Sequence, residues 1–302
     1  MNDPSHKVAL ITGATGFIGR HLARRLATDG WQVHAIVRPQ SNTDALADFD
    51  AITTHTFDGH PATLEAVFRD AKPGAVFHLA THYVAEHKAE DIGPMVNANM
   101  LFGLNLLQAM KAVPGSVLVN AGTSWQVSDA PDHAPVNLYA AIKQAFEDCV
   151  AYHAAVENLQ AVTLRLFDVY GPDDPRGKLM SLLMRLARTE ETLDMSPGGQ
   201  LLDLVYVDDA VDGFVAAAHR ARAMTAPGHE VYALSGRDHR TLKHVAQAFE
   251  NVSGARLNIV WGRRPYRARE VMTPWTDGTP LPGWAPRVSL EEGIERMLAA
   301  DV

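Results

Sequence analysis

Short runs of apolar and β-branched residues alternate along this chain with longer stretches in which apolar residues recur at helical spacing. The short runs predict buried strands, and the longer stretches predict helices with one apolar face. Their alternation predicts an α/β fold, in which a parallel sheet has crossover helices on both faces. The predicted strands are 8–11, 32–37, 52–56, 75–79, 117–119 and 162–167, and the predicted helices are 18–28, 63–71, 98–112 and 139–157.

The regular alternation ends after Gly171-Pro172, where turn-forming residues occupy 173–177. A further helix is predicted over 178–189, and we expect a smaller lobe to begin here. The strand-like run 204–207 and the helix from Asp209 predict a return to the large domain. We therefore assign 1–170, with a return segment at about 203–222, to the large domain, and 171–202 and 223–302 to the smaller lobe.

Composition and charge restrict the class of protein. Of the 302 residues, 47% are hydrophobic and 21% are charged, and no apolar run approaches the length of a membrane span. Residues 1–7 are polar and lack a signal-peptide core, so we expect a cytoplasmic protein with no membrane partner. The formal charge is −8 without a concentrated basic tract, which argues against nucleic acid as a partner. Cys149, the only cysteine, lies on an apolar helix face and is expected to pack there.

A glycine-rich turn follows the first predicted strand and opens the first helix. Gly13, Gly16 and Gly19 recur at every third position, unlike the Gly-x-Gly-x-x-Gly spacing of the ordinary dinucleotide fingerprint. Glycines here let backbone amides approach a pyrophosphate at the positive end of the helix. The turn therefore predicts a dinucleotide site that includes Gly13, Thr15, Gly16, Phe17, Ile18 and Gly19.

Arg38 follows the second strand, where an acidic residue would bind the unmodified adenosine ribose of NAD. A guanidinium can instead pair bidentately with a 2′-phosphate, which favours NADP(H) and leaves NAD(H) possible. The alternative is a solvated charge at the end of a strand. Further cofactor contacts are predicted where later strands end and the next helices begin, at Asp58, Gly59, Leu79, Ala80, Thr81 and Asn99.

Tyr139 and Lys143 stand four residues apart in a predicted helix, so both side chains leave from one face. A nearby cation favours the phenolate and is expected to lower the pKa of the tyrosine, as proton transfer near neutral pH requires. Any helix can carry such a pair as a solvated contact. The context favours a catalytic pair that also contacts the cofactor.

The chain resembles the extended short-chain dehydrogenase/reductases in the segments 12–19, 78–80, 99–107, 139–143, 164–172, 203–209 and 284–293. This resemblance implies a Rossmann-type doubly wound parallel sheet for the large domain and a smaller C-terminal lobe that binds substrate, usually a nucleotide sugar. It also implies a third catalytic residue after the fifth strand, for which we choose Thr123, with Ser124 as the alternative. The helices 98–112 and 139–157 match those that form a four-helix interface in homodimeric relatives.

Departures from the family pattern bear on the reaction and the substrate. Dehydratases of the family place Asp-Glu after the catalytic threonine, whereas Ser124-Trp125 stands here, so dehydration is disfavoured. Asp168 replaces a common asparagine and Leu202 a common diphosphate-binding arginine. The arginines at 263, 264, 267 and 269 offer other cations for a diphosphate, or form a solvated basic loop. The predicted substrate contacts are His82, Thr123, Ser124, Trp125, Asp168, Arg263, Arg267 and Arg269; no histidine spacing predicts a metal site.

Three functions are compatible with these features. The leading interpretation is NADPH-dependent reduction of a 4-keto (deoxy)sugar nucleotide, with hydride from nicotinamide and a proton from Tyr139. Arg38 supports it because a reductase consumes NADPH, whereas epimerases of the family commonly retain NAD. The alternative is a nucleotide-sugar 4-epimerase, which needs the same residues. The third, a sensor that binds NADP without turnover, is disfavoured by the intact pair of Tyr139 and Lys143.

Overall fold

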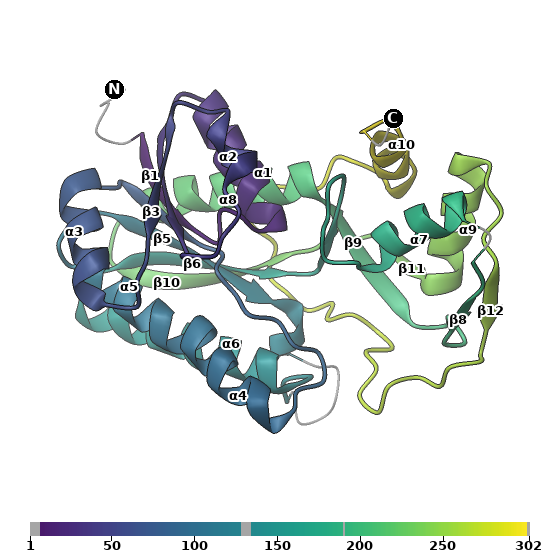
Figure 1. Cartoon of the computed structure of the whole chain (residues 1–302). Coiled ribbons are helices and arrows are strands. Elements are labelled where there is room, and N and C mark those ends of the chain that lie inside the picture. Colours follow the sequence, from purple (N-terminus) through teal and green to yellow (C-terminus); the bar gives the residue numbers. More distant parts are fainter. Residues whose placement is uncertain (1–6, 128–133, 190, 301–302) are drawn as a thin grey trace.

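A seven-stranded parallel sheet forms the centre of the computed structural model, which describes residues 7–127, 134–189 and 191–300 (Figure 1). Its strands lie in the order β10-β6-β5-β4-β1-β2-β3, and each neighbouring pair is parallel. The predicted α/β fold is confirmed. The strands are β1 (Val8–Thr12), β2 (Gln32–Val37), β3 (Ile52–Thr56), β4 (Ala75–His78), β5 (Val117–Thr123), β6 (Gln160–Leu166) and β10 (Gly228–Leu234).

Helices cover both faces of this sheet, as the near-continuous apolar strands require. Alternate residues of β1 belong to two separate apolar cores, one on each face of the sheet. Ala9 and Ile11 pack in the core that includes α1 and α8, and Leu10 packs in the core that includes α3, α5 and α6. Short α2 (Asp44–Ala47) lies beside α1. The covering helices are α1 (Phe17–Thr28), α8 (Val207–Arg222), α3 (Pro61–Ala71), α5 (Phe102–Met110) and α6 (Leu138–Val156).

The predicted helix 98–112 is the end of a longer, irregular one. It starts as α4 (Ala89–Val96), passes through a π-helical segment (Asn97–Leu101) and continues as α5. Pro94 lies inside α4. Proline is unfavourable within a helix because it lacks the backbone N–H, so the sequence did not predict a helix there. π-Helical insertions occur frequently at functional sites, and this one contains the buried Asn99.

In the described part of the chain, two small sheets and the helices α7, α9 and α10 lie together beyond the end of the large sheet, largely within the residues predicted to form the smaller lobe (Figure 1). β9 pairs with β7 and β11 in one sheet, and β8 pairs with β12 in the other. α9 packs against both α7 and α10. The bounds are β7 (Asp168–Tyr170), β8 (Leu193–Met195), β9 (Leu201–Tyr206), β11 (His239–Thr241), β12 (Ile259–Trp261), α7 (Leu179–Arg188), α9 (Leu242–Ser253) and α10 (Leu290–Ala300).

Two elements differ from the predicted division of the chain. β9, predicted to return to the large domain with 203–222, lies in the three-stranded sheet, although α8 after it packs on the large sheet. β10 lies within 223–302, predicted as smaller lobe, yet it pairs with β6 as the seventh strand. β10 begins with glycine, histidine and glutamate, and its apolar residues 231–234 do not by themselves say to which sheet the strand belongs. The division into two units otherwise stays a prediction.

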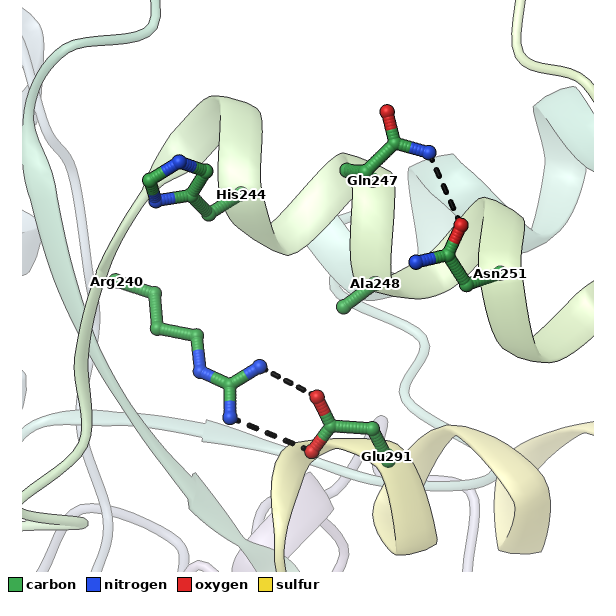
Figure 2. Close-up of a pocket in the computed structure, with 6 residues that line it drawn as sticks. All are labelled: Arg240, His244, Gln247, Ala248, Asn251 and Glu291. Carbon is green, nitrogen blue, oxygen red and sulfur yellow. Dashed lines mark hydrogen bonds and ion pairs between the residues drawn. The ribbon is translucent and has the colours of Figure 1, made fainter.

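No helix in the described part of the chain combines the length and the apolar character that a bilayer crossing requires. A polar hollow of about 410 Å³ opens between α9 and α10 (Figure 2). Its charged and amide groups pair with one another: Arg240 with Glu291 at 2.5 Å and Gln247 with Asn251 at 3.1 Å. The predicted catalytic and cofactor residues lie elsewhere, at or beside the edge where the strands of the large sheet end.

Candidate active site

The turn between β1 and α1 brings three pieces of backbone together. Gly13 has a φ of +73°, and a Cβ at this position would lie 2.7 Å from the Ala80 nitrogen. A Cβ at Gly19 would collide with the Gly13 carbonyl oxygen, so the first turn of α1 lies directly on this loop. A side chain at either position would therefore push apart the loop, the start of α1 and the 79–80 segment, and so move the backbone amides that can approach a pyrophosphate. The residues present fit a dinucleotide.

The predicted cofactor residues beyond this turn lie at the carboxyl ends of adjacent strands. Arg38 follows β2 and is exposed, and its backbone N–H donates to Ser41 Oγ at 3.1 Å. Asp58 follows β3 and accepts hydrogen bonds from Thr63 Oγ1 at 2.7 Å and the His60 N–H at 3.0 Å. Because β1, β2 and β3 are neighbours, the glycine turn, Arg38 and Asp58 share one edge of the sheet. Phe17 is different: its side chain is buried beneath the Arg176 guanidinium, 4.4 Å away.

Tyr139 and Lys143 lie in the first two turns of α6, which the Asn137 side chain caps by accepting from the Ala140 N–H at 3.0 Å. Only 9% of Tyr139 and 2% of Lys143 is exposed. The Thr81 hydroxyl lies 3.3 Å from the Tyr139 hydroxyl and donates to Asn99 Oδ1 at 2.7 Å. Asn99 also binds both backbone groups of His82. The structure thus brings together Tyr139, Thr81, Asn99 and His82, which the sequence assigned from separate segments.

Burial changes the expected acidities of the pair. Desolvation raises the pKa of Tyr139, against a smaller opposing effect of the Thr81 hydrogen bond. Desolvation also lowers the pKa of Lys143 to about 8, and the Glu147 carboxylate opposes this shift. The expected lowering of the Tyr139 pKa by Lys143 is therefore not observed, because both groups are buried and the desolvation of the phenolate dominates. Tyr139 is held as a neutral phenol, the form that donates a proton.

Thr123 is the last residue of β5 and begins a 3₁₀ turn (Ser124–Gln126). Its hydroxyl accepts from the Trp125 N–H at 3.3 Å, and its own N–H donates to Gln126 Oε1 at 2.8 Å. Thr123 is half-buried, whereas its alternative Ser124 is only 7% exposed. The geometry therefore makes the Thr123 hydroxyl the more accessible of the two.

An aromatic cluster adjoins Tyr139. The Tyr83 ring meets the Tyr139 ring edge to face at 5.1 Å and lies 6.0 Å from the Trp125 ring. Lys178 Nζ lies 5.8 Å from the centre of the Tyr83 ring and 3.0 Å from Asp168 Oδ1. Burial first, and then the Asp168 charge, raise the pKa of Tyr83 to about 12. Tyr83, still 43% exposed, therefore presents a neutral aromatic surface between Tyr139 and an ion pair.

Comparison with known proteins adds an independent observation. The model of the NAD dependent epimerase/dehydratase family matches residues 9–233, about three quarters of the chain. The chain belongs to this family. It is therefore an NAD(P)-dependent enzyme of the extended short-chain dehydrogenase/reductase type with a nicotinamide dinucleotide cofactor, as the sequence predicted.

Relatives of this epimerase/dehydratase family member include both synthases and epimerases. CDP-abequose synthase of Salmonella typhimurium is 25% identical over 296 residues, covering 96% of each chain. UDP-glucose 4-epimerase of Mycolicibacterium smegmatis is 28% identical over 317 aligned positions, covering 95% of this chain and 96% of that one. UDP-glucose 4-epimerase of Thermotoga maritima, solved with UDP-glucose, has a TM-score of 0.83 at 23% identity, with 97% and 98% of the chains covered. The last likeness is one of fold.

The four arginines predicted to replace a diphosphate-binding residue are divided in this enzyme. Arg269 donates to the Pro135 carbonyl oxygen at 3.2 Å, close to the start of α6. The Arg267 charge partly opposes the rise in the pKa of Tyr83 that burial causes. Arg263 instead lies 3.5 Å from Asp194 on β8. The structure therefore brings Arg267 and Arg269 toward the aromatic cluster and holds Arg263 in the smaller lobe.

Two residues of this cluster were absent from the predicted contacts. Tyr83 follows directly on His82, which was among the predicted substrate contacts. Lys178 carried no sequence signal, since its partner Asp168 lies ten residues earlier and a turn cluster separates them. Among the described residues, no group of three or more histidine, cysteine, aspartate or glutamate side chains could hold a metal ion.

Proposed function

We propose that this enzyme uses NADPH to reduce the 4-keto group of a deoxysugar attached to a nucleotide. The observation that carries this proposal is the buried, neutral Tyr139 beside Lys143 at the carboxyl edge of the sheet. The similarity to CDP-abequose synthases of three bacterial strains, at 24 to 25% identity, supports a nucleotide-linked deoxysugar.

The residues divide the work of reduction among them. A reduced nicotinamide dinucleotide held at the glycine turn would supply the hydride for the carbonyl carbon. Tyr139 donates its phenolic proton to the carbonyl oxygen and regains a proton from solvent, which balances the reaction as ketone to alcohol. Lys143 stabilises the phenolate that forms, because its positive charge lies on the same helix face. Thr123 orients the oxygen by hydrogen bonding, and the Tyr83 and Trp125 rings contact the apolar face of the sugar.

A direct assay tests the direction of the reaction. We expect the purified enzyme to oxidise one equivalent of NADPH for each equivalent of added CDP- or UDP-linked 4-keto-6-deoxyglucose. The loss of near-ultraviolet absorbance by the reduced nicotinamide measures this. The similarity to 4-epimerases favours a second candidate. Interconversion of UDP-glucose and UDP-galactose in an NMR tube, without net change in cofactor, would establish epimerisation in place of reduction.

We propose NADP(H) as the preferred cofactor, with Arg38 binding the 2′-phosphate. Arg38→Asp is expected to weaken NADP about 10- to 100-fold while NAD binding changes little, because one charge-assisted contact is replaced by repulsion. Titration of both dinucleotides by tryptophan fluorescence or calorimetry measures this. Arg69→Asp, on the exposed side of α3, serves as the control. Equal losses for both cofactors would contradict the role of Arg38.

We propose further that two copies associate through the outer faces of α4, the π-helical segment and α6. Large apolar side chains are exposed there, and α6 packs beside α4 and the π-helical segment, so the face is continuous (Figure 1). Such a patch is typical of an interface. It consists of Ile92 (43% exposed), Val96 (40%), Leu101 (51%), Tyr152 (59%) and Val156 (55%).

The double variant Leu101→Asp, Tyr152→Glu is expected to be a monomer at concentrations where the wild type is a dimer, because two buried, unpaired carboxylates oppose association. Light scattering after size-exclusion chromatography measures the mass of each. Met272→Glu places a charge on an exposed apolar residue outside this face and should leave the dimer intact. A wild type that is monomeric at every concentration would overturn the proposal.

A further inference from the structure

A chain of buried polar side chains lies directly beneath the Thr123 turn. Arg165 Nη2 on β6 donates to Glu147 Oε1 on α6 at 2.6 Å, and Arg165 Nε lies 3.3 Å from Oε2. Gln126 Nε2 donates to Glu147 Oε2 at 2.9 Å and to Gln144 Oε1 at 3.1 Å, and Gln144 Oε1 also accepts from Arg165 Nη2 at 3.0 Å. Gln126 Oε1 in turn accepts the backbone N–H of Thr123 at 2.8 Å. Hydrogen bonds thus run without interruption from β6 through α6 to the residue proposed to orient the substrate oxygen.

The chemistry of this chain depends on each group keeping its donor or acceptor role. Glu147 is 4% exposed and uses both carboxylate oxygens as acceptors. Because Gln126 turns its amide nitrogen toward that carboxylate, its oxygen must face the Thr123 N–H. The orientation of Gln126, and with it the 3₁₀ turn that starts at Thr123, therefore depends on its two acceptors, of which Glu147 is the charged and the closer one.

Glu147 is also placed to act on the proposed catalytic helix. It follows Lys143 by one helical turn on α6, and its charge raises the pKa of Lys143 against the effect of burial. On the other side, the Arg165 guanidinium lies 5.4 Å from the centre of the Trp275 ring. Trp275 belongs to the C-terminal segment that carries Arg267 and Arg269, and this segment returns to the large sheet, where Thr279 accepts from the Ala233 N–H at 2.8 Å. The chain of contacts therefore joins α6, the Thr123 turn and the segment near the aromatic cluster.

A buried ion pair adds little to the free energy of unfolding, because the desolvation penalty offsets most of the attraction between the charges. Apolar side chains of similar volume would stabilise the fold equally. What the charged pair supplies here is direction: it selects one orientation of Gln126 and so one position of the Thr123 backbone. We propose that Glu147 is a positioning residue, which acts through Gln126 to align Thr123 with the oxygen that Tyr139 protonates. This inference rests on the proposed function, in which Thr123 orients that oxygen.

Glu147→Gln tests the proposal with little change in volume. The introduced amide can still accept from Arg165, but its NH₂ group then faces the NH₂ group of Gln126. We expect this repulsion to displace Gln126 from the Thr123 N–H, although Gln144 Oε1 still accepts from Gln126. Gln126→Leu breaks the same link while the ion pair of Glu147 and Arg165 stays intact. For both variants we expect kcat for NADPH oxidation with the 4-keto sugar nucleotide to fall about 10- to 100-fold, with KM within about twofold, because misalignment acts on the reacting geometry.

The matched control is Glu157→Gln, which removes a charge just beyond the end of α6, where Glu157 pairs with Lys111 at 2.6 Å. It should leave kcat unchanged. The double variant Gln126→Glu, Glu147→Gln exchanges the two groups and restores an acceptor for both the Thr123 N–H and the new amide. It should recover most of the lost kcat, which a merely structural role of Glu147 would not predict.

Amide hydrogen exchange over residues 120–127 gives a readout that needs no substrate. The rate of amide hydrogen exchange should rise in Glu147→Gln and in Gln126→Leu. It should return to the wild-type rate in the double variant Gln126→Glu, Glu147→Gln and stay unchanged in Glu157→Gln. Unaltered exchange in both single variants, or loss of kcat without recovery in the exchanged pair, would overturn the positioning role. Absence of NADPH oxidation by the wild type, together with the expected exchange pattern, would instead reject the proposed reaction and retain the link to Thr123.

Discussion

Tyr139→Phe is expected to lower kcat by about 10²- to 10⁴-fold, the usual contribution of a positioned general acid. The phenylalanine ring keeps the edge-to-face contact with Tyr83 and removes only the hydroxyl that lies beside Thr81. Cofactor affinity and the free energy of unfolding should therefore change little. The measurements are steady-state oxidation of NADPH with a 4-keto-6-deoxyglucose nucleotide, and cofactor binding to the same preparation.

Tyr232→Phe provides the control, since it removes the hydroxyl of another buried tyrosine, which donates to Glu230 at 2.7 Å on β10. This variant should retain full activity. A Tyr139→Phe enzyme with more than about a tenth of the wild-type kcat would show that the proton reaches the substrate by another route. Loss of cofactor binding in parallel with kcat would assign Tyr139 to binding.

Lys143→Met is expected to abolish activity and, at neutral pH, to raise the free energy of unfolding. Burial lowers the pKa of Lys143 from 10.5 to about 8, so the charged lysine at pH 7 carries a desolvation penalty on the order of 3 kcal/mol. A methionine of similar length fills the space without that penalty. The protein thus gives up stability for a buried cation beside Tyr139, which is the arrangement expected of a catalytic group.

The pH dependence of stability distinguishes this cause from better packing. Because the folded-state pKa lies below the unfolded value, the penalty is present in full below about pH 8 and is relieved as pH rises toward 10.5. Urea titrations should therefore show the gap between variant and wild type narrowing across that range. Lys111→Met, which removes an exposed ion pair, should change stability by less than about 1 kcal/mol. A destabilised Lys143→Met protein at pH 7 would contradict the desolvation argument.

Activity should follow the same group. If the cationic form of Lys143 stabilises the phenolate, the rate of reduction falls as pH rises through about 8, where Lys143 loses its proton. A profile of kcat measured from about pH 6 to about 10 would show this decrease in rate. Glu147→Gln should move it to lower pH, since the Glu147 charge raises the pKa of Lys143.

Local patterns were sufficient for much of the fold. The predicted strand 32–37 coincides with β2, whose apolar residues are buried, and 52–56 coincides with β3, an edge strand that was recognised by its β-branched residues. The glycine turn and the pair of Tyr139 and Lys143 were equally accessible, since both depend on spacing within one element. β10 was not assigned to the large sheet, although residues 231–234 form an apolar run, because its place beside β6 depends on a pairing between segments far apart in the sequence.

The amino-acid sequence alone thus determined the α/β fold, the family, the glycine turn and the helix that presents Tyr139 and Lys143. Only the tertiary structure decided which residues of other elements contact the site. It placed Thr81 beside Tyr139, Lys178 beside Asp168, and Gln126 between Thr123 and Glu147. It also reversed the expected acidity of Tyr139, because four residues of spacing predict a neighbouring charge but not the burial of both groups. Spacing along a helix is a local property, whereas desolvation depends on every element that packs around the site.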